Sequence, residues 1–264
     1  MEFEVIQINK HKQLNKKTMK KLVAFLFFVM VSCITVTVNA QDFSLNGQTM
    51  VRSKYVGPDG LQFYGDPVIQ SNFTLNHKSG LFFDLWISSG FNTKFSNDWD
   101  DEIDYTLGWS GKISSFLLNS SLSYFDDFDN FNFTYNDVGK GNIHLGYPKQ
   151  IKPWLKVVPY VDYITFIIPN KNTPFNGGNM YSVGFDNEII ITEKIKVTPL
   201  IQFSLDDGAL GVKAGSLLKL ASNLNWTLSK HFVWNVVEAT FYSPSNKRGM
   251  KDELVLGAGL SWNL

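Results

Sequence analysis

The sequence predicts an all-β protein, because apolar and polar side chains alternate along most of the chain after residue 40. In one such segment Ile103, Tyr105 and Leu107 alternate with Asp104 and Thr106. Each such strand has an apolar face and a polar face, which suits a closed barrel that meets lipid outside and solvent inside. Aromatic residues make up 15% of the chain, as expected where rings form interfacial girdles. We therefore predict a transmembrane antiparallel up-and-down β-barrel of the Gram-negative outer membrane.

The first 40 residues are typical of a secretory leader. Four lysines between positions 16 and 21 precede an apolar run over residues 22–38, and Ala40 ends a small-residue site for signal peptidase. We predict translation from Met19 after an N-terminal extension, and cleavage after Ala40. The alternative, an anchoring helix, is disfavoured because polar residues thin the run near its end.

Composition limits what the predicted mature segment, residues 41–264, can do. Cys33 is the only cysteine and lies in the leader, which excludes disulfides and cysteine-based sites from the mature chain. That segment holds 18 basic and 22 acidic residues, a formal charge of −4, and shows no concentrated basic face for nucleic acid. Its length suits one barrel domain.

Strand and turn signals divide the barrel segment into about twelve strands. Tight turns, expected on the periplasmic side, alternate with longer external loops, and an even strand count returns both ends to the periplasm. The expected strands are 45–55, 68–77, 81–91, 102–110, 116–125, 141–147, 154–164, 180–189, 195–205, 217–228, 232–242 and 253–264, with tight turns at 78–80, 111–112, 148–149, 192–194 and 229–231. Pro159 and Pro199 fall inside strands, where we expect bulges. The strand 232–242 has no cleanly apolar face.

Two segments resemble a known family. Residues 80–89, Gly-Leu-Phe-Phe-Asp-Leu-Trp-Ile-Ser-Ser, and 101–109, Asp-Glu-Ile-Asp-Tyr-Thr-Leu-Gly-Trp, resemble the TorF family of outer-membrane porins. The resemblance extends to Val197-Thr198-Pro199 and to the Asp-Asp-Gly loop at 206–208. It implies an outer-membrane barrel with a transport role, and it supplies no catalytic or ligand-binding residues.

Charged residues of both signs fall on the inward faces of the expected strands. The predicted lumen-lining residues are Arg52, Lys54, Asp84, Glu102, Asp104, Lys156, Asp162, Lys196, Lys219, Glu238 and Glu253. We expect Glu253 to pair with Arg52 or Lys54 across the closing seam, Glu188 with Lys196 across a tight turn, and Lys219 with Glu238. Either a weakly selective polar pore or a lumen plugged by its own ion pairs would fit this pattern.

No catalytic site is predicted. His144 is expected to point into the lumen, and no Ser-His-Asp or His-Glu-x-x-His arrangement accompanies it. Acidic runs at 98–104 and 126–129 could collect Ca²⁺, but solvated loops explain them better, so neither a metal nor a cofactor is expected.

The leading hypothesis for function is a porin-like channel for passive passage of small hydrophilic solutes or ions. The alternative is a structural or ligand-binding barrel that acts through external loops, with the aromatic and acidic segment 125–135 as a binding ridge. Expected partners are outer-membrane lipid, the barrel-assembly machinery during biogenesis, and small solutes.

Overall fold

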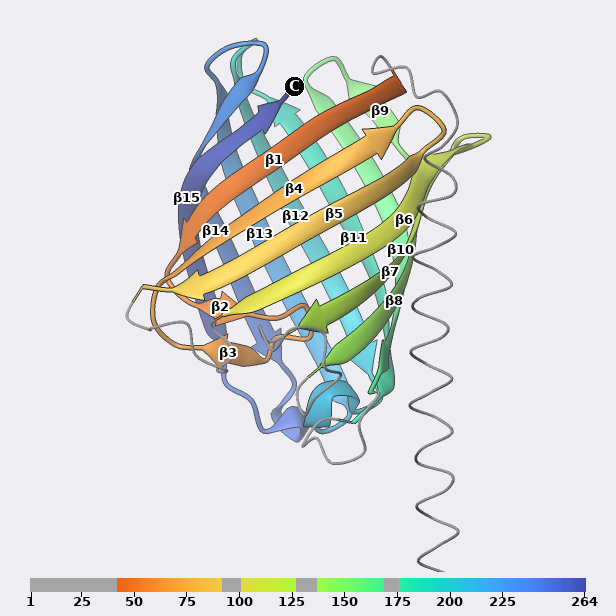
Figure 1. Cartoon of the computed structure of the whole chain (residues 1–264), viewed down its shortest axis with the longest axis vertical. Helices are drawn as coiled ribbons and strands as arrows, with labels where there is room; N and C mark the ends of the chain where they lie inside the picture. Colours follow the sequence, from red (N-terminus) through yellow and green to blue (C-terminus); the bar gives the residue numbers. More distant parts are fainter. Residues whose placement is uncertain (1–41, 92–100, 127–136, 169–175) are drawn as a thin grey trace, which may run out of the picture. The chain divides into compact units, whose positions relative to one another are not determined.

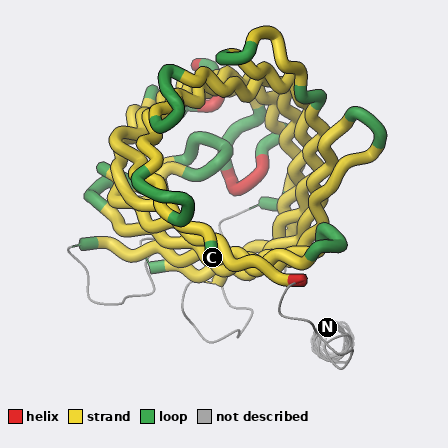
Figure 2. The backbone as a smooth tube through the Cα atoms, turned by 90° about the horizontal axis from the view of Figure 1, so that it is seen from above, coloured by secondary structure: helices red, strands yellow, loops and turns green. Residues whose placement is uncertain are grey.

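A computed structural model describes residues 42–91, 101–126, 137–168 and 176–264, and twelve strands of this part close into a barrel (Figures 1 and 2). In order around the barrel they are β1 (Phe43–Arg52), β4 (Val68–His77), β5 (Leu81–Gly90), β6 (Glu102–Ile113), β7 (Phe116–Asp126), β8 (Val138–Gly146), β10 (Leu155–Ile167), β11 (Gly178–Ile190), β12 (Ile195–Asp206), β13 (Gly215–Thr227), β14 (Phe232–Pro244) and β15 (Glu253–Asn263). Within these residues no helix is long and apolar enough to span a membrane. The expected leader lies outside the described part of the chain.

The barrel closes where the first and last strands pair. β1 and β15 run antiparallel, with Asn46 opposite Asn263 and Arg52 opposite Gly257. The ten neighbouring pairs from β4–β5 to β14–β15 are antiparallel as well, and β1 is hydrogen-bonded to β4, so no barrel edge is left open. The predicted fold class, a twelve-stranded up-and-down barrel, is confirmed.

Apolar side chains of the strands face outward. Leu107 is 47% exposed on β6, and Leu122, opposite it on β7, is 67% exposed. Thr106 and Ser123, next to them in the sequence, point inward and hydrogen-bond to each other at 2.7 Å. This alternation places a lipid-compatible belt around a polar interior, which is the arrangement that a membrane barrel requires.

Most expected strands agree with the structure, but two expected tight turns are wrong. β6 continues through Gly111 and Lys112 to Ile113 and turns at Ser114, whose φ is +57°. Residues 148–149 do not form the next turn either, because β9 (Lys149–Lys152) extends from Lys149 and pairs with the start of β10. β8 and β10 are therefore joined through an additional short hairpin, whose residues are exposed.

The expected bulges at the prolines are also wrong. Pro159 pairs with Phe185, and Pro199 with Ser222, without a shift in register. Register shifts lie instead between β9 and β10, at Leu155 and Lys156, and in β14, where Val236 is the extra residue between two registers with β13. Because of this extra residue, Trp234 and Val237 both face outward, which explains why the strand shows no single apolar face in the sequence.

The seam between β1 and β15 is closed on the lipid side by an aromatic ring. A Cβ atom placed on Gly47 would lie only 2.1 Å from the ring of Trp262, so this position tolerates no side chain unless the indole moves. The same ring lies 5.9 Å from the ring of Phe73 on β4. Trp262 therefore spans the seam by covering the backbone of β1.

The two ends of the barrel differ. At one end, uppermost in Figure 1, lie the short turns and the C-terminus; at the other lie the longer loops. Three of these loops are described throughout: loop 1 (residues 53–67), which contains β2 (Tyr55–Val56) and β3 (Gln62–Tyr64); loop 5 (207–214), which contains the 3₁₀ turn Ala209–Gly211; and loop 6 (245–252), which contains the 3₁₀ turn Asn246–Arg248. The view along the barrel shows loop segments and a helical turn within the ring of strands (Figure 2).

Candidate functional site in the barrel lumen

A cavity of about 410 Å³ lies inside the barrel near the long-loop end. Its walls come from strands around much of the ring together with loops 1 and 5. Loop 1 contributes Tyr55 and Phe63, and loop 5 contributes Leu210. Neither loop was expected inside the barrel, because period-two alternation carries no information about where a connection folds.

The structure brings seven of the predicted lumen residues to this cavity. These are Arg52, Lys54, Asp84, Glu102, Asp104, Lys219 and Glu238. The remaining four, Lys156, Asp162, Lys196 and Glu253, lie outside the cavity lining. Lys156 is opposite Glu188 in the β10–β11 ladder, and Asp162 accepts a hydrogen bond from Asn142 at 2.8 Å and lies 3.6 Å from His144.

Arg52 forms the most extensive polar contact in the cavity wall. Its Nε and Nη2 atoms donate to the two carboxylate oxygens of Glu238 at 3.0 and 2.9 Å, and its Nη1 atom donates to Gln70. This bidentate pair links β1 to β14 across the intervening strand β15. The expected pairing of Glu238 with Lys219 is therefore wrong, and Lys219 instead lies 5.5 Å from the centre of the Tyr242 ring.

Two other expected ion pairs are present. Lys54 lies 2.6 Å from Glu253 across the seam, so of the two expected partners Lys54 is the one that pairs. Lys196 lies 3.3 Å from Glu188 across the turn between β11 and β12. Both pairs keep partly exposed side chains, so each contributes modestly to stability.

The acidic residues of the cavity wall accept hydrogen bonds largely from uncharged side chains. Asp84 accepts hydrogen bonds from Thr74 at 2.5 Å and Asn72 at 3.3 Å, and Glu102 accepts one from the hydroxyl of Tyr55 at 2.8 Å. On Asp104 the Oδ1 atom is buried and has no hydrogen-bond partner among the described residues. Asp104 also hydrogen-bonds to Glu102, which requires one of the two carboxyl groups to carry a proton, and Lys140 lines the same cavity. The negative charge of this wall is therefore limited to Asp84 and the Glu102–Asp104 pair.

Tyr55 anchors loop 1 against this acidic wall. Its ring lies 5.1 Å from that of Phe63 and 5.5 Å from that of Trp86, centre to centre. Burial, with the nearby carboxylates of Glu102 and Asp104, raises the pKa of Tyr55 well above its usual value of 10. Tyr55 is therefore a neutral hydrogen-bond donor at every physiological pH.

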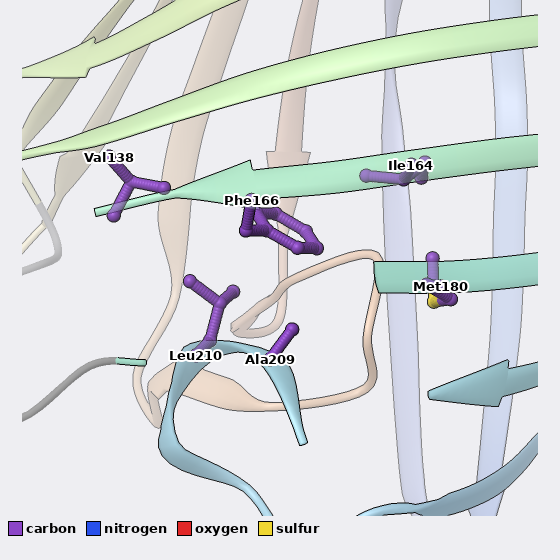
Figure 3. Close-up of a cluster of buried hydrophobic side chains, with 6 residues drawn as sticks. All are labelled: Val138, Ile164, Phe166, Met180, Ala209 and Leu210. Atoms are coloured by element: carbon purple, nitrogen blue, oxygen red, sulfur yellow. The ribbon is translucent and has the colours of Figure 1, made fainter. Parts of the chain in front are cut away.

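Loop 5 packs into the opposite, apolar part of the mouth. Leu210 and Ala209 are buried with Val138, Phe166 and Met180, which reach them from the inward faces of β8, β10 and β11 (Figure 3). Phe63 of loop 1 packs against the same cluster. The mouth therefore has a charged wall and an apolar wall, with loops 1 and 5 between them.

Several predicted features fall partly or wholly outside the described residues. The aromatic and acidic ridge at 125–135 is described only at its first two residues, and the acidic run at 98–104 only from Asp101 onward. Within the described residues, no group of three or more His, Cys, Asp or Glu side chains is placed to hold a metal ion.

Solved structures similar to this barrel include porins and an outer membrane channel. The NanC porin matches with a TM-score of 0.52 and 8% identity over 83% of this chain and 100% of that one. This chain therefore shares the β-barrel fold of that protein. The KdgM porin in complex with disordered oligogalacturonate gives a TM-score of 0.49 at 7% identity, over 83% and 98% of the two chains. An outer membrane channel, COG4313, from Pseudomonas putida F1 gives a TM-score of 0.49 at 11% identity, over 84% and 94%.

At such low identities the likeness shows the fold alone. No family model and no curated protein matches the chain. The resemblance to the TorF family therefore stays a prediction, while the broader expectation of an outer-membrane porin barrel agrees with the solved structures.

Proposed function

We propose that the protein is an outer-membrane channel, and not an enzyme, for the passive passage of small hydrophilic solutes or ions. The observation that carries this proposal is a cavity inside a closed barrel whose wall holds charges of both signs. A dedicated structural barrel of this size would gain more from side chains that fill the lumen. Lipid around the apolar belt and the barrel-assembly machinery are the partners that such a protein needs.

We further propose that the mouth mildly favours cations. Glu238 and Glu253 neutralise Arg52 and Lys54, whereas Asp84 and Glu102 receive hydrogen bonds from neutral side chains. Lys140 and Lys219 also line the cavity, so we expect the negative field to be confined to the wall around Asp84 and Glu102. It acts on ions at longer range in dilute salt, because the Debye length grows from about 10 Å at 0.1 M to about 30 Å at 0.01 M.

The test is conductance of the refolded barrel in a planar bilayer under a salt gradient. We expect small, discrete current steps, and we expect the double variant Glu102→Gln, Asp104→Asn to shift the reversal potential toward anions. Glu193→Gln, which removes a charge from an exposed turn outside the cavity, is the matched control and should leave the reversal potential unchanged. A folded barrel that conducts nothing at any voltage or salt concentration, both as wild type and in variants that release loops 1 and 5, would reject the channel.

A second candidate function is supported by loops 1 and 5, which fold into the mouth. If these loops plug the lumen permanently, the barrel acts through its exposed loop surface as a structural or ligand-binding protein. Non-conducting wild-type protein, together with non-conducting variants that release the loops, would favour this candidate.

A further inference from the structure

Three loops at the long-loop end are joined by one buried side chain, Arg248. It lies in the 3₁₀ turn of loop 6 and is 3% exposed. Its Nη2 atom lies 3.1 Å from Oδ2 of Asp206, at the end of β12, and both side chains are fully buried. Its Nη1 atom donates to the backbone carbonyl oxygen of Asp59 in loop 1 at 2.8 Å.

Asp206 carries this connection into loop 5. Its second carboxylate oxygen, Oδ1, accepts hydrogen bonds from the backbone N–H groups of Gly208 at 2.6 Å and Ala209 at 2.9 Å. The carboxylate thus fixes the turn that presents Leu210 to the interior. We call Arg248, Asp206 and the Asp59 carbonyl the Arg248 latch, since together they connect loops 1, 5 and 6.

The loops held by the latch extend across the mouth. Loop 1 packs Val56 against Leu217, Tyr242 and Val255, on the inward faces of β13, β14 and β15. The same loop reaches β6 through the hydrogen bond from Tyr55 to Glu102. Loop 5 covers the arc formed by β8, β10 and β11. Residues that the latch positions therefore line this end of the cavity.

A fully buried ion pair is a poor choice for stability alone. Desolvation of both charges offsets most of their attraction, and apolar residues of similar size often stabilise a protein better. Such a pair does fix a single arrangement strongly, because removal of one partner leaves the other charge buried and uncompensated. These properties suit an ion pair that stabilises one loop arrangement strongly and leaves the loops free to change arrangement once the pair is lost.

We propose that the Arg248 latch is a gate, which holds loops 1 and 5 in the mouth and whose release opens the lumen. This inference rests on the proposed channel function for its physiological meaning, but the movement of the loops can be measured without conductance. Loss of Arg248 removes both its ion pair with Asp206 and its hydrogen bond to loop 1. Loop 5 then keeps its apolar contacts and its hydrogen bonds to Asn176 and Asn179, which hold it less firmly than the complete latch.

The first measurement is accessibility of the cavity. In a Cys33→Ser background, a reporter cysteine replaces Lys219, which lines the cavity. Lys219 is the next inward-facing residue of β13 after the buried Leu217. We expect Arg248→Met and Asp206→Asn each to raise the rate at which a charged, water-soluble thiol reagent modifies the reporter by about tenfold, the effect of about 1.4 kcal/mol on the closed state. Lys247→Met, an exposed neighbour in the same turn, is the matched control and should leave the rate unchanged.

The second measurement restores closure without the latch. A Cβ atom on Gly178, at the start of β11, would lie 2.9 Å from the Cβ atom of Ala209 and 2.8 Å from its Cα atom. Loop 5 must therefore move outward by about 1 Å before cysteines at positions 178 and 209 can form a disulfide. In the Arg248→Met background without the reporter, oxidation should return the single-channel conductance to the wild-type value. Reduction should raise it again.

The outcomes separate the gate from the channel. If wild type and latch variants conduct alike and the reporter reacts equally fast in all of them, the gate is overturned while the channel stands. If no variant conducts but the reporter reacts faster in latch variants, the gate stands and the channel fails. If Arg248→Met does not fold, the same measurements on Asp206→Asn test the gate. This variant should fold, because an asparagine side-chain oxygen can still accept the two backbone hydrogen bonds of loop 5.

Discussion

Asp59, in loop 1, is a buried carboxyl group beside the latch. Its side chain is fully buried, Oδ1 accepts the N–H of Leu61 at 3.2 Å, and Oδ2 has no partner among the described residues. Burial raises its pKa from the usual 3.8 to about 6, against the opposing charge of Arg248. Asp206, from β12, and Tyr55, from loop 1, also face it electrostatically.

This pKa predicts that acid favours the closed loops. Since the closed-state pKa is the higher one, closure is most stable below pH 4 and loses stability as the pH rises through about 6. Between pH 5 and 7.5 conductance should rise, with an upper limit of about tenfold in the open-to-closed ratio, because only about one unit of the pKa shift lies above pH 5. Asp59→Asn should conduct equally at both pH values. Unchanged pH dependence in that variant would assign the effect to another group.

Leu107 tests the lipid-facing register at a single residue. It lies near the middle of β6 and is 47% exposed, so an arginine there would be placed in hydrocarbon. We expect Leu107→Arg to lower the free energy of unfolding in lipid vesicles by about 2–4 kcal/mol. Ile113→Arg, at the end of the same strand, is the control and should cost about 0–1 kcal/mol. Equal costs at both positions would contradict the register.

At the scale of strands, the alternation in the sequence was enough to locate nearly all of them. The range 68–77 matches β4 at both ends, because a loop with Gly and Pro precedes it and a Gly-containing turn follows. Gly111 and Lys112 resembled a turn, but β7 continues to pair with them in register, so sheet pairing overrode local preference. The bulge at Val236 also escaped prediction, since one extra residue hides the alternation on both sides of it.

The register of β1 and β15 makes a second strand-level prediction. Gln48 lies opposite Ser261, and the two side chains hydrogen-bond at 3.1 Å. Cysteines at these two positions should therefore crosslink in the folded barrel. Cysteines at Arg52 and Glu253 should not, because Arg52 lies opposite Gly257, four residues away. Mobility on non-reducing gels distinguishes the two pairs, and crosslinking of the second pair alone would contradict the seam.

At the scale of the whole molecule, the barrel was predictable and the mouth was not. Inward-facing charges such as Arg52 and Glu102 are visible in a period-two pattern, so seven predicted lumen residues do meet at the cavity. Arg248 gave no such signal, because it lies in a loop that has no period. Its role follows only from the positions of Asp59 and Asp206, which are distant in the sequence.

The contact of Trp262 with Gly47 has a consequence for the order of assembly. These residues are among the most widely separated in the barrel sequence, and a contact that closes so long a loop carries a large entropic cost. Neighbouring hairpins can form before this contact, whereas the two outermost strands meet only when the sheet has curled. An indole ring that covers a bare backbone favours that last encounter, so we expect a side chain at Gly47 to slow closure of the sheet.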